Sequence, residues 1–398
     1  MQLKIIEFFA GIGAFSYSAK KINEKYNKQI FKTIAISDWY LKSTIAYAAI
    51  YNDVLNIKNN INYLDVFENK TLSFNADSAI KKYKTKSEDW LNLAANSFIQ
   101  SNNLGNINEI DIKKLDELNG DIWTYSFPCQ GISSVNVNNK GILDKTSKSS
   151  IIWNFGKVLK DVKNKPKYLI LENVPPLITK YQNEYQKWLD YLKELGYSTI
   201  TRLVNAYELG SLQIRKRVIA ISYLGEIAHS SLDFYFHMAW KKPNLKKLKE
   251  KYLNTFDIEN KKTIPFLITN TQSRKKILDK NINLSDLELA KKRNYKVRTL
   301  LTSPERFNIP GFLTWDKKLE NNNYLPFRHL SIEESLKLQN FDDKYIEIFD
   351  KLEKMKILNK HDLYKLIGNS IDTKITDLAL GAILTHEEIM KGTKIKYV

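Results

Sequence analysis

The sequence predicts an α/β fold in which helices cover both faces of a mostly parallel sheet, together with a smaller, irregular second domain. Three observations lead to this prediction. Short apolar runs alternate with helical patterns up to about residue 224, and strand, turn and helix in repetition are typical of a parallel sheet. Some of these runs are continuously apolar, as expected for strands that are buried on both faces. From about residue 225 the alternation gives way to an irregular, basic stretch.

Each predicted strand is a short, largely apolar run. The strands are expected at Gln2–Phe9, Phe31–Ser37, Asp121–Phe127, Lys167–Glu172 and Val218–Tyr223. Helical periodicity predicts helices at Phe15–Glu24, Leu41–Tyr51, Tyr185–Leu195, Ser331–Gln339 and Ile371–Met390. An Asn- and Lys-rich stretch over residues 52–110 interrupts the alternation, and we interpret it as an insertion.

The composition is that of a globular chain of 398 residues, of which 43% are hydrophobic and 27% charged. The apolar runs are too short to span a bilayer, and the first residues lack the features of a secretion signal. A single cysteine excludes an intramolecular disulfide and a cysteine-cluster metal site. We therefore expect a soluble, cytoplasmic protein that does not span a membrane, and we expect no metal site.

The net charge of +18 indicates a polyanionic partner, with nucleic acid as the first candidate and an anionic membrane surface as the second. Residues 225–327 contain 16 lysines and 4 arginines against 11 acidic residues, which is half of the excess charge in about a quarter of the chain. Most lysines are interpreted as solvated surface. The eight arginines begin only at Arg202, and their rigid fork of donors suits phosphates and base edges in a way that lysine cannot copy.

Chemically informative residues follow the predicted strands. In open parallel sheets, ligands bind beyond the carboxyl ends of the strands. The residues found there are Gly11, Gly13, Asp38, Trp39, Cys129, Glu172 and Asn173. We expect them to gather at one edge of the sheet.

Gly11 and Gly13 let the backbone approach a ligand closely, although a plain tight turn explains the motif about equally well. Ser16 stands where the dinucleotide fingerprint has its third glycine, which argues against a phosphate-binding loop and a dehydrogenase. Asp38 can accept hydrogen bonds from ribose hydroxyls, and Trp39 offers a face for an adenine ring. These features favour a nucleoside-type cofactor without an essential pyrophosphate, with S-adenosylmethionine as the candidate.

Cys129 follows a strand end and a proline and precedes the stretch 131–150, whose composition suggests flexibility. An isolated cysteine is most often an inert buried thiol. A thiol at the edge of a sheet can instead act as a nucleophile once it is deprotonated. A cysteine–histidine hydrolase is the rival interpretation, but all five histidines come late and none lies in a recognisable partner motif.

Glu172 ends a wholly apolar strand, and a carboxylate there is either a capped structural acid or a functional acid. Gln213, Arg215 and Arg217 just precede the strand Val218–Tyr223, and alternation points them to one side. A surface charge cluster is the simpler interpretation. It explains less well why arginines appear here in a lysine-dominated chain.

Taken in order, these motifs resemble those of the DNA cytosine C5-methyltransferase family. The resembling segments are Phe9–Gly13, Phe127–Gln130, Glu172–Val174, Gln213–Arg217, Arg328–Phe341 and Tyr364–Ile371. Outside the match lie mainly residues 52–105 and 225–327. Residues 36–75, which include Glu68–Phe74, are most similar to the small-genome bacterial branch that includes CpG-type enzymes. The chain departs from common family choices at Ala14, Asp38, Asn106, Asn154, His329 and Asn340, none of which removes a residue that the chemistry needs.

The resemblance implies a Rossmann-like fold of the S-adenosylmethionine-dependent methyltransferase type. It also implies a catalytic and cofactor-binding domain over residues 1–224, a target-recognition domain over 225–327, and a return to the catalytic domain over 328–398. The expected catalytic residues are Pro128, Cys129, Glu172, Asn173, Gln213, Arg215 and Arg217. The expected cofactor-binding residues are Phe9, Ala10, Gly11, Ile12, Gly13, Asp38, Trp39, Asn106, Ile107, Phe127, Ile151, Asn369 and Ser370. The expected DNA-binding residues are Gln130, Ser133, Arg274, Arg293, Arg298, Thr299 and Arg306.

The implied reaction is methyl transfer from S-adenosylmethionine to C5 of a flipped cytosine in a short, specific sequence of double-stranded DNA, with S-adenosylhomocysteine as product. Cys129 would attack C6, and Glu172 would hold and protonate N3. Arg215 would bond the cytosine O2, and Arg217 would support it or the thiolate. The stretch 131–150 is expected to close over the site once the base has left the duplex.

The resemblance further implies a monomer of the bacterial cytosol, with a cognate restriction endonuclease as a candidate partner in a restriction-modification system. The expected target is a short palindrome, for which CpG and four-base sites are candidates. An RNA cytosine methyltransferase is one alternative, but most of that class uses two cysteines. A catalytically silent DNA-binding protein of the same fold is the other, and the intact Cys129, Glu172 and Arg215 argue against it.

Overall fold

The computed structural model describes residues 2–57, 61–134, 139–226, 235–236, 243–256, 266–280, 287–302, 312–314 and 323–392. The chain divides into two compact units. Unit 1 comprises Met1–Val204, Lys216–Ala239 and Ile375–Val398, and unit 2 comprises Asn205–Arg215 and Trp240–Lys374. Unit 1 is therefore assembled from segments that are far apart in the sequence.

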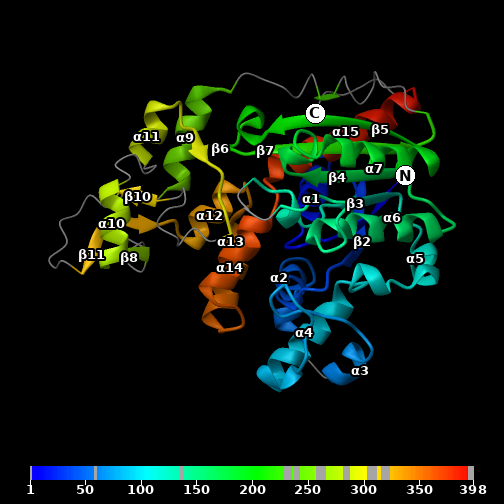
Figure 1. Cartoon of the computed structure of the whole chain (residues 1–398), viewed down its shortest axis with the longest axis horizontal. Coiled ribbons are helices and arrows are strands. Elements are labelled where there is room, and N and C mark those ends of the chain that lie inside the picture. Colours follow the sequence, from blue (N-terminus) through cyan, green and yellow to red (C-terminus); the bar gives the residue numbers. More distant parts are fainter. Residues whose placement is uncertain are drawn as a thin grey trace. The chain divides into compact units, whose positions relative to one another are not determined.

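The core of unit 1 is a twisted sheet with the strand order β2-β1-β3-β4-β7-β5 (Figure 1). Its strands are β1 (Leu3–Phe8), β2 (Phe31–Ser37), β3 (Ile122–Tyr125), β4 (Tyr168–Asn173), β5 (Tyr197–Asn205) and β7 (Lys216–Leu224). β1 pairs in parallel with β2 and β3, and β3 pairs in parallel with β4, whereas β7 runs antiparallel to β4. The carboxyl ends of β1 to β4 therefore meet at one edge of the sheet.

Helices cover both faces of this sheet. The helices of this part of the chain are α1 (Ala14–Tyr26), α2 (Leu41–Tyr51), α3 (Tyr63–Phe67), α4 (Glu88–Gln100), α5 (Ile112–Leu118), α6 (Ile152–Asp161), α7 (Gln182–Glu194) and α15 (Thr373–Met390), of which α3 and α4 lie in the stretch 52–110. On one face, Phe8 and Tyr125 pack against Phe155 of α6, with ring centroids 5.2 and 4.3 Å apart. On the other face, Glu7 bonds to the start of α1 and Tyr168 bonds to α15. Successive side chains of a strand point to opposite faces of the sheet, so neighbouring residues such as Glu7 and Phe8 contact different helices.

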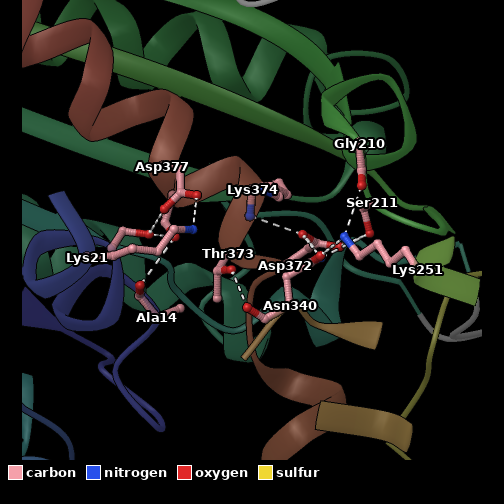
Figure 2. A network of polar contacts seen from close by, with 12 residues as sticks. Ala14, Lys21, Gly210, Ser211, Lys251, Asn340, Asp372, Thr373, Lys374 and Asp377 are labelled. Atoms are coloured by element: carbon pink, nitrogen blue, oxygen red, sulfur yellow. Dashed lines mark hydrogen bonds and ion pairs between the residues drawn. The ribbon is translucent and has the colours of Figure 1, made fainter. Parts of the chain in front are cut away.

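The helix α15 packs against α1 through polar contacts (Figure 2). The Ser18 hydroxyl donates to Asp377 at 2.7 Å and lies 2.6 Å from the hydroxyl of Thr376, which is 358 positions away in the sequence. Thr376 donates to the Ala14 carbonyl at 3.2 Å, and Lys21 forms an ion pair with Asp377 at 2.5 Å. The end of the chain thus helps to fix the helix that follows β1.

Residues 52–110, interpreted as an insertion, form a small aromatic cluster of their own. Phe67 of α3 stacks on Tyr83 with ring centroids 5.8 Å apart, and Trp90 of α4 meets Phe74 edge-on at 5.6 Å. The Ser73 amide donates to the carbonyl of Trp39 at 2.8 Å, so part of the insertion lies beside the segment that follows β2.

Unit 2 is built from short elements. They are β6 (Gln213–Ile214), α9 (Leu245–Thr255), β8 (Leu267–Thr269), α10 (Gln272–Lys280), α11 (Leu287–Lys292), β9 (Val297–Arg298), β10 (Phe312–Thr314), β11 (Tyr324–His329), α12 (Ile332–Leu338), α13 (Asp343–Lys354) and α14 (Lys360–Asn369). β11 pairs antiparallel with both β10 and β8, and β6 pairs in parallel with β9. Among the helices that the structure describes in either unit, none is long and apolar enough to cross a membrane.

A buried ion pair joins β11 to α12 in unit 2. The Arg328 guanidinium donates two hydrogen bonds of 2.8 Å to the Glu334 carboxylate, and the two side chains are 1% and 2% exposed. We expect Arg328→Met to lower the free energy of unfolding by about 3–5 kcal/mol, because it leaves the carboxylate charged and buried. Urea denaturation measures this loss, and the double variant with Glu334→Leu should recover much of it. A single variant as stable as the parent would contradict the expectation.

The structure confirms the mostly parallel α/β fold and the predicted elements. Phe31–Ser37 and Leu41–Tyr51 have the predicted bounds, and the other predicted strands and helices are found within a few residues of theirs. The two units are divided at other residues than the predicted domains, since 205–215 and 328–374 belong to unit 2. The functional assignments of the predicted domains stay predictions.

Candidate active site

The loop that follows β1 has a backbone conformation rarely seen in such a short stretch. Phe9, Gly11 and Gly13 have φ angles of 55°, 56° and 80°, all in the left-handed region. Glycine adopts this region freely, but a bulky residue such as Phe9 is strained there. The Phe9 amide donates to the carbonyl of Ser37 at the end of β2, at 2.7 Å. Strain of this kind is concentrated at functional sites, which makes the loop a candidate ligand site.

The two glycines of the loop are required for different reasons. A Cβ on Gly13 would lie 2.6 Å from the ring of Tyr51 and 2.7 Å from that of Tyr47, so only glycine lets the loop pack on α2. A Cβ on Gly11 would meet no atom of the described residues within 4 Å. The backbone at Gly11 therefore faces open space that a ligand could enter.

Asp38, half-buried after β2, is bonded to the same loop. Its carboxylate accepts hydrogen bonds from the amides of Gly11 at 3.0 Å and Tyr40 at 2.9 Å. The Asn103 side chain holds the Asp38 backbone, accepting from its amide at 3.0 Å and donating to its carbonyl at 2.9 Å. Burial raises the pKa of Asp38 to about 6, so the carboxylate is mostly ionised at neutral pH and able to accept further hydrogen bonds.

The segment around Asn106 is tied to the end of β2. The Ser37 hydroxyl donates to the Gly105 carbonyl at 2.9 Å, and the Asn106 side chain accepts from the amide of Asn108 at 3.1 Å. Of the other predicted cofactor-binding residues in unit 1, Trp39 and Ile151 are half-buried, whereas Ala10, Ile12, Ile107 and Phe127 are buried. The loop after β1, Asp38 and Asn106 thus come together at the same edge of the sheet.

Glu7 is a further site candidate, and no motif reveals it. Its side chain is 2% exposed, and its carboxylate accepts from the amides of Phe15 and Ser16 at 3.2 Å and from the Ser16 hydroxyl at 2.6 Å. These contacts cap the start of α1 directly after the loop. Burial raises the pKa of Glu7 to about 7. An acid inside an apolar strand is the sequence signal that would have found it, as it did for Glu172.

The raised pKa of Glu7 predicts a specific pH dependence. The folded protein holds the Glu7 proton up to about pH 7, whereas the unfolded chain releases it near 4.5, so this stabilisation is complete below pH 4.5 and lost as the pH rises through 7. Between pH 5 and 8 the unfolding free energy of the parent should fall because Glu7 loses its proton. In Glu7→Gln this fall should be smaller by about 3 kcal/mol. Urea denaturation at several pH values measures it. Parallel pH profiles for the parent and the variant would show that Glu7 does not titrate in this range.

Cys129 lies half-buried at the start of a short 3₁₀ turn, Cys129–Gly131, with Gln130 exposed beside it. The amides of Ile132 and Ser133 donate to the Cys129 carbonyl at 3.0 and 2.8 Å. On the preceding side, the Asn173 amide group donates to the carbonyl of Phe127 at 3.0 Å. The end of β4 therefore holds the segment that leads into Cys129.

Glu172, the residue before Asn173, forms an ion pair with Arg217 of β7. Arg217 Nε lies 2.9 Å from Glu172 Oε1, and the side chains are 13% and 8% exposed. Two neighbouring antiparallel strands supply the pair, since Asn173 stands opposite Val218 in the register. A largely desolvated carboxylate, oriented by an arginine, thus lies next to the residue that holds the Cys129 segment.

Gln213 and Arg215 lie in unit 2, where their side chains form hydrogen bonds with backbone groups. Gln213 donates to the Leu338 carbonyl at 2.7 Å and accepts from the Leu300 amide at 2.9 Å. The Arg215 guanidinium is 2% exposed and donates to the carbonyls of Leu300, Gly368 and Ser370 at 3.0, 3.2 and 2.7 Å. The predicted contact of Arg215 with cytosine O2 stays a prediction, and these contacts give the side chain a structural role inside unit 2.

Asn369 and Ser370, predicted to bind the cofactor, end α14 in unit 2; Asn369 is exposed and Ser370 is buried. Close to them in sequence, the buried Asp372 accepts from the Ser211 hydroxyl at 2.6 Å and from the Asn340 amide at 2.7 Å (Figure 2). Lys251 of α9 also bonds to Asn340. Burial raises the pKa of Asp372. This network links Ser211, two residues before Gln213, with α9 and with the segment that follows α14.

The predicted DNA-binding residues differ in their exposure to solvent. Arg293 and Arg298 are exposed, whereas Arg274 is half-buried and donates to the Thr269 carbonyl at 3.1 Å. The Thr299 hydroxyl donates to the Ile214 carbonyl at 2.6 Å, and Ser133 is half-buried. Arg306 lies outside the described residues. Within the described parts of the chain, no group of three His, Cys, Asp or Glu side chains could hold a metal ion.

Comparison with known proteins gives a coherent result. A family model described as C-5 cytosine-specific DNA methylase matches residues 67–384. The orphan methyltransferase M.SssI of Spiroplasma monobiae is 28% identical over 410 residues, which cover 96% of this chain and 97% of that protein. The type II methyltransferase M2.ScrFI of Lactococcus lactis subsp. cremoris is 29% identical over 376 residues, which cover 93% and 95%.

Solved structures support the same fold. The Dnmt2 methyltransferase of S. pombe superposes with a TM-score of 0.63 at 15% identity, covering 98% of this chain and 99% of that one. The Entamoeba histolytica methyltransferase EhMeth gives a TM-score of 0.60 at 17% identity, with coverage of 98% and 99%. At such low identity the likeness concerns the fold alone, and it agrees with the predicted fold class.

Proposed function

Because the chain belongs to the C-5 cytosine-specific DNA methylase family, we propose that it transfers a methyl group from S-adenosylmethionine to C5 of a flipped cytosine in a short, specific sequence of double-stranded DNA. The reaction proceeds in this proposal through a covalent bond between Cys129 and C6 of the base.

One observation carries the proposal further than the family assignment does. The Glu172–Arg217 ion pair at the ends of β4 and β7 places an oriented carboxylate next to Asn173, and Asn173 in turn holds the segment leading into Cys129. A nucleophile and an acid for a ring nitrogen are the two groups that this chemistry requires from the protein. Here Glu172 and Asn173, which are adjacent in β4, connect the acid with the segment that carries the nucleophile.

The loop after β1 is suited to S-adenosylmethionine. The open space at Gly11 allows close approach to the backbone, and the Asp38 carboxylate bonded to that loop can accept from ribose hydroxyls. Asn106, whose carbonyl oxygen is an acceptor, is suited to the adenine amino group. S-adenosylmethionine supplies an electrophilic methyl group on its sulfonium when bound. We propose Phe9, Gly11, Asp38, Trp39 and Asn106 as the main contacts of unit 1, alongside the other predicted cofactor-binding residues.

In the proposed mechanism, the Cys129 thiolate forms a bond to C6 of the extruded cytosine, which makes C5 electron-rich. Glu172 in its protonated form donates a hydrogen bond or proton to N3, offsetting the negative charge that develops on the ring, and takes the proton back when the sulfur leaves. C5 then takes the methyl group from the sulfonium, which leaves as the neutral thioether S-adenosylhomocysteine, and C5 afterwards loses its proton to a base. The electrons of that C–H bond re-form the ring double bond and expel the Cys129 sulfur, which restores the enzyme.

The two arginines of the Gln213–Arg217 motif make different contacts. Arg217 contacts Glu172 directly and so is suited to orient the acid. Arg215 joins the segments at Leu300, Gly368 and Ser370 within unit 2. We therefore propose that Arg217 supports Glu172, and that Arg215 stabilises unit 2 beside its proposed contact with cytosine O2.

We further propose that unit 2 carries target recognition. Its exposed Arg293 and Arg298 offer donors to phosphates or base edges, and Arg274, Thr299 and Arg306 remain proposed contacts. In unit 1, Gln130 within the Cys129 turn and Ser133 just after it are proposed to contact DNA. A cognate restriction endonuclease is a proposed partner.

The experiment that tests the function is methyl transfer from labelled S-adenosylmethionine to separate pools of double-stranded DNA, single-stranded DNA and RNA. We expect label in double-stranded DNA, and bisulfite sequencing of the product should find 5-methylcytosine within one short sequence. Label in RNA alone would favour an RNA methyltransferase. DNA binding without transfer to any pool would favour a catalytically silent protein of the same fold.

A further inference from the structure

We propose that Ser149 is a positioning residue that sets the geometry of the turn carrying Cys129, an inference that rests on the proposed nucleophilic role of that cysteine. The Ser149 hydroxyl donates to the Pro128 carbonyl at 2.6 Å and accepts from the Gly131 amide at 3.0 Å. One side-chain atom therefore bridges the two peptide groups that flank Cys129 and Gln130.

A hydroxyl is required for this bridge. The Pro128 carbonyl needs a donor and the Gly131 amide needs an acceptor, and a serine oxygen is both at a single atom. The hydrogen bonds that the turn makes with itself, from Ile132 and Ser133, end on the carbonyl of Cys129 and satisfy neither group. Ser149 is fully buried, so alanine there would deprive two backbone groups of this partner away from bulk water.

The turn Cys129–Gly131 packs against Ser147 and Ser149. Ser147 accepts from the Ser149 amide at 3.2 Å and donates to the Gly141 carbonyl at 2.6 Å. A Cβ on Gly131 would lie 1.9 Å from the Ser147 oxygen and 3.0 Å from that of Ser149, so the Gly131 backbone touches both hydroxyls. The Gly141 amide also donates to the Gly131 carbonyl at 2.9 Å. The bridging hydroxyl is thus held in place from a neighbouring segment.

Ser149 complements the contact made by Asn173. Asn173 holds the carbonyl of Phe127, and Ser149 holds the next carbonyl, that of Pro128. Two successive peptide groups before Cys129 and one after it are therefore fixed by side chains from different parts of the chain. Nucleophilic attack depends on the position of the sulfur to within about 1 Å, because misplacement of that size costs roughly 10²-fold in rate. The role of Ser149 is to supply this precision.

The test compares Ser149→Ala with Ser149→Thr, which keeps a hydroxyl, and with Ser101→Ala. Ser101 is a matched control, because it is also a buried serine, and among the described residues its hydroxyl donates to the carbonyls of Ser97 and Phe98 in the preceding turn of α4. The readouts are kcat and KM for methyl transfer, and the rate at which Cys129 forms an adduct with DNA that carries 5-fluorocytosine.

We expect Ser149→Ala to lower kcat and the adduct rate by roughly 10- to 100-fold while KM for DNA and cofactor changes little. Ser149→Thr should retain most of the rate, and Ser101→Ala should match the parent. A parental adduct rate in Ser149→Ala would overturn the inference, as would equal losses in Ser149→Ala and Ser101→Ala.

Thiol alkylation separates this inference from the proposed function. Iodoacetamide reports on the setting of Cys129, the only cysteine in the chain, without needing DNA. We expect a changed alkylation rate in Ser149→Ala, at an unchanged melting temperature, and the parental rate in Ser149→Thr. If Ser149→Ala does not fold, Ser147→Ala, which removes the support of the Ser149 amide, should show a smaller shift in the same direction. An inactive parent would refute the function, whereas an unaltered alkylation rate in both variants would refute only the role of Ser149.

Discussion

Replacing Cys129 by serine is expected to lower methyl transfer by roughly 10⁴-fold or more, while binding of DNA and S-adenosylmethionine is retained. Serine keeps the shape of the side chain but is a far weaker nucleophile at neutral pH, so the bond to C6 does not form. The half-buried position of Cys129 in a turn held by Asn173 and Ser149 makes a large folding effect from this replacement unexpected. Single-turnover transfer of labelled methyl groups measures the loss, and fluorescence anisotropy measures DNA binding.

A covalent adduct provides a second measurement of the same prediction. DNA with 5-fluorocytosine at the target should trap the enzyme, because fluorine at C5 cannot leave as the proton does. Since Cys129 is the only cysteine, peptide mapping of the adduct has a unique expected position. Near-parental transfer by Cys129→Ser, or a trapped peptide that lacks Cys129, would refute the covalent route.

Glu172→Gln is the second change with a large expected effect, a fall in kcat of roughly 10²- to 10⁴-fold. Glutamine preserves the size of the side chain and keeps an oxygen for Arg217, whose Nε lies 2.9 Å from the Glu172 carboxyl, but it cannot deliver a proton to N3. KM for DNA should change far less than kcat, because the lost interaction strengthens during the reaction. Steady-state kinetics on a duplex containing the target separates the two parameters.

Two further variants make the Glu172 result specific. Glu24→Gln is a control, because Glu24 is 64% exposed and pairs only loosely with Lys20 at 3.4 Å; it should behave as the parent. Arg217→Lys keeps the charge but not the fork and should lower kcat in the same direction as Glu172→Gln. A Glu172→Gln enzyme with parental kcat would remove the acid from the mechanism.

The fold was predictable where the chain has strong local patterns. Continuous apolar runs predicted the strands, and the Leu41–Tyr51 helix has the predicted bounds. The helix α4 was not predicted, because it lies in the Asn- and Lys-rich stretch where local composition suggests an irregular insertion. Its stability comes from aromatic contacts such as Trp90 with Phe74, which depend on tertiary structure and not on propensity.

The candidate site was predictable as a set of residue types but not as a set of contacts. Motif order singled out Cys129, Glu172 and Asp38, yet it gave no means of telling which arginine meets Glu172. The pairing with Arg217 depends on the register of β4 against β7, a long-range property. Glu7 and Ser149 were missed for a related reason, since each acts on backbone groups that only the folded chain brings within reach.

The contacts between Ser18 and Thr376 have a consequence for biosynthesis. A ribosome that adds about 5–20 residues per second needs roughly 20–70 s to make the 358 residues that separate these two partners. During that time the start of α1 lacks its partner from α15, and the first unit cannot close until α15 has been synthesised. The timing predicts that activity appears only after α15 has been made.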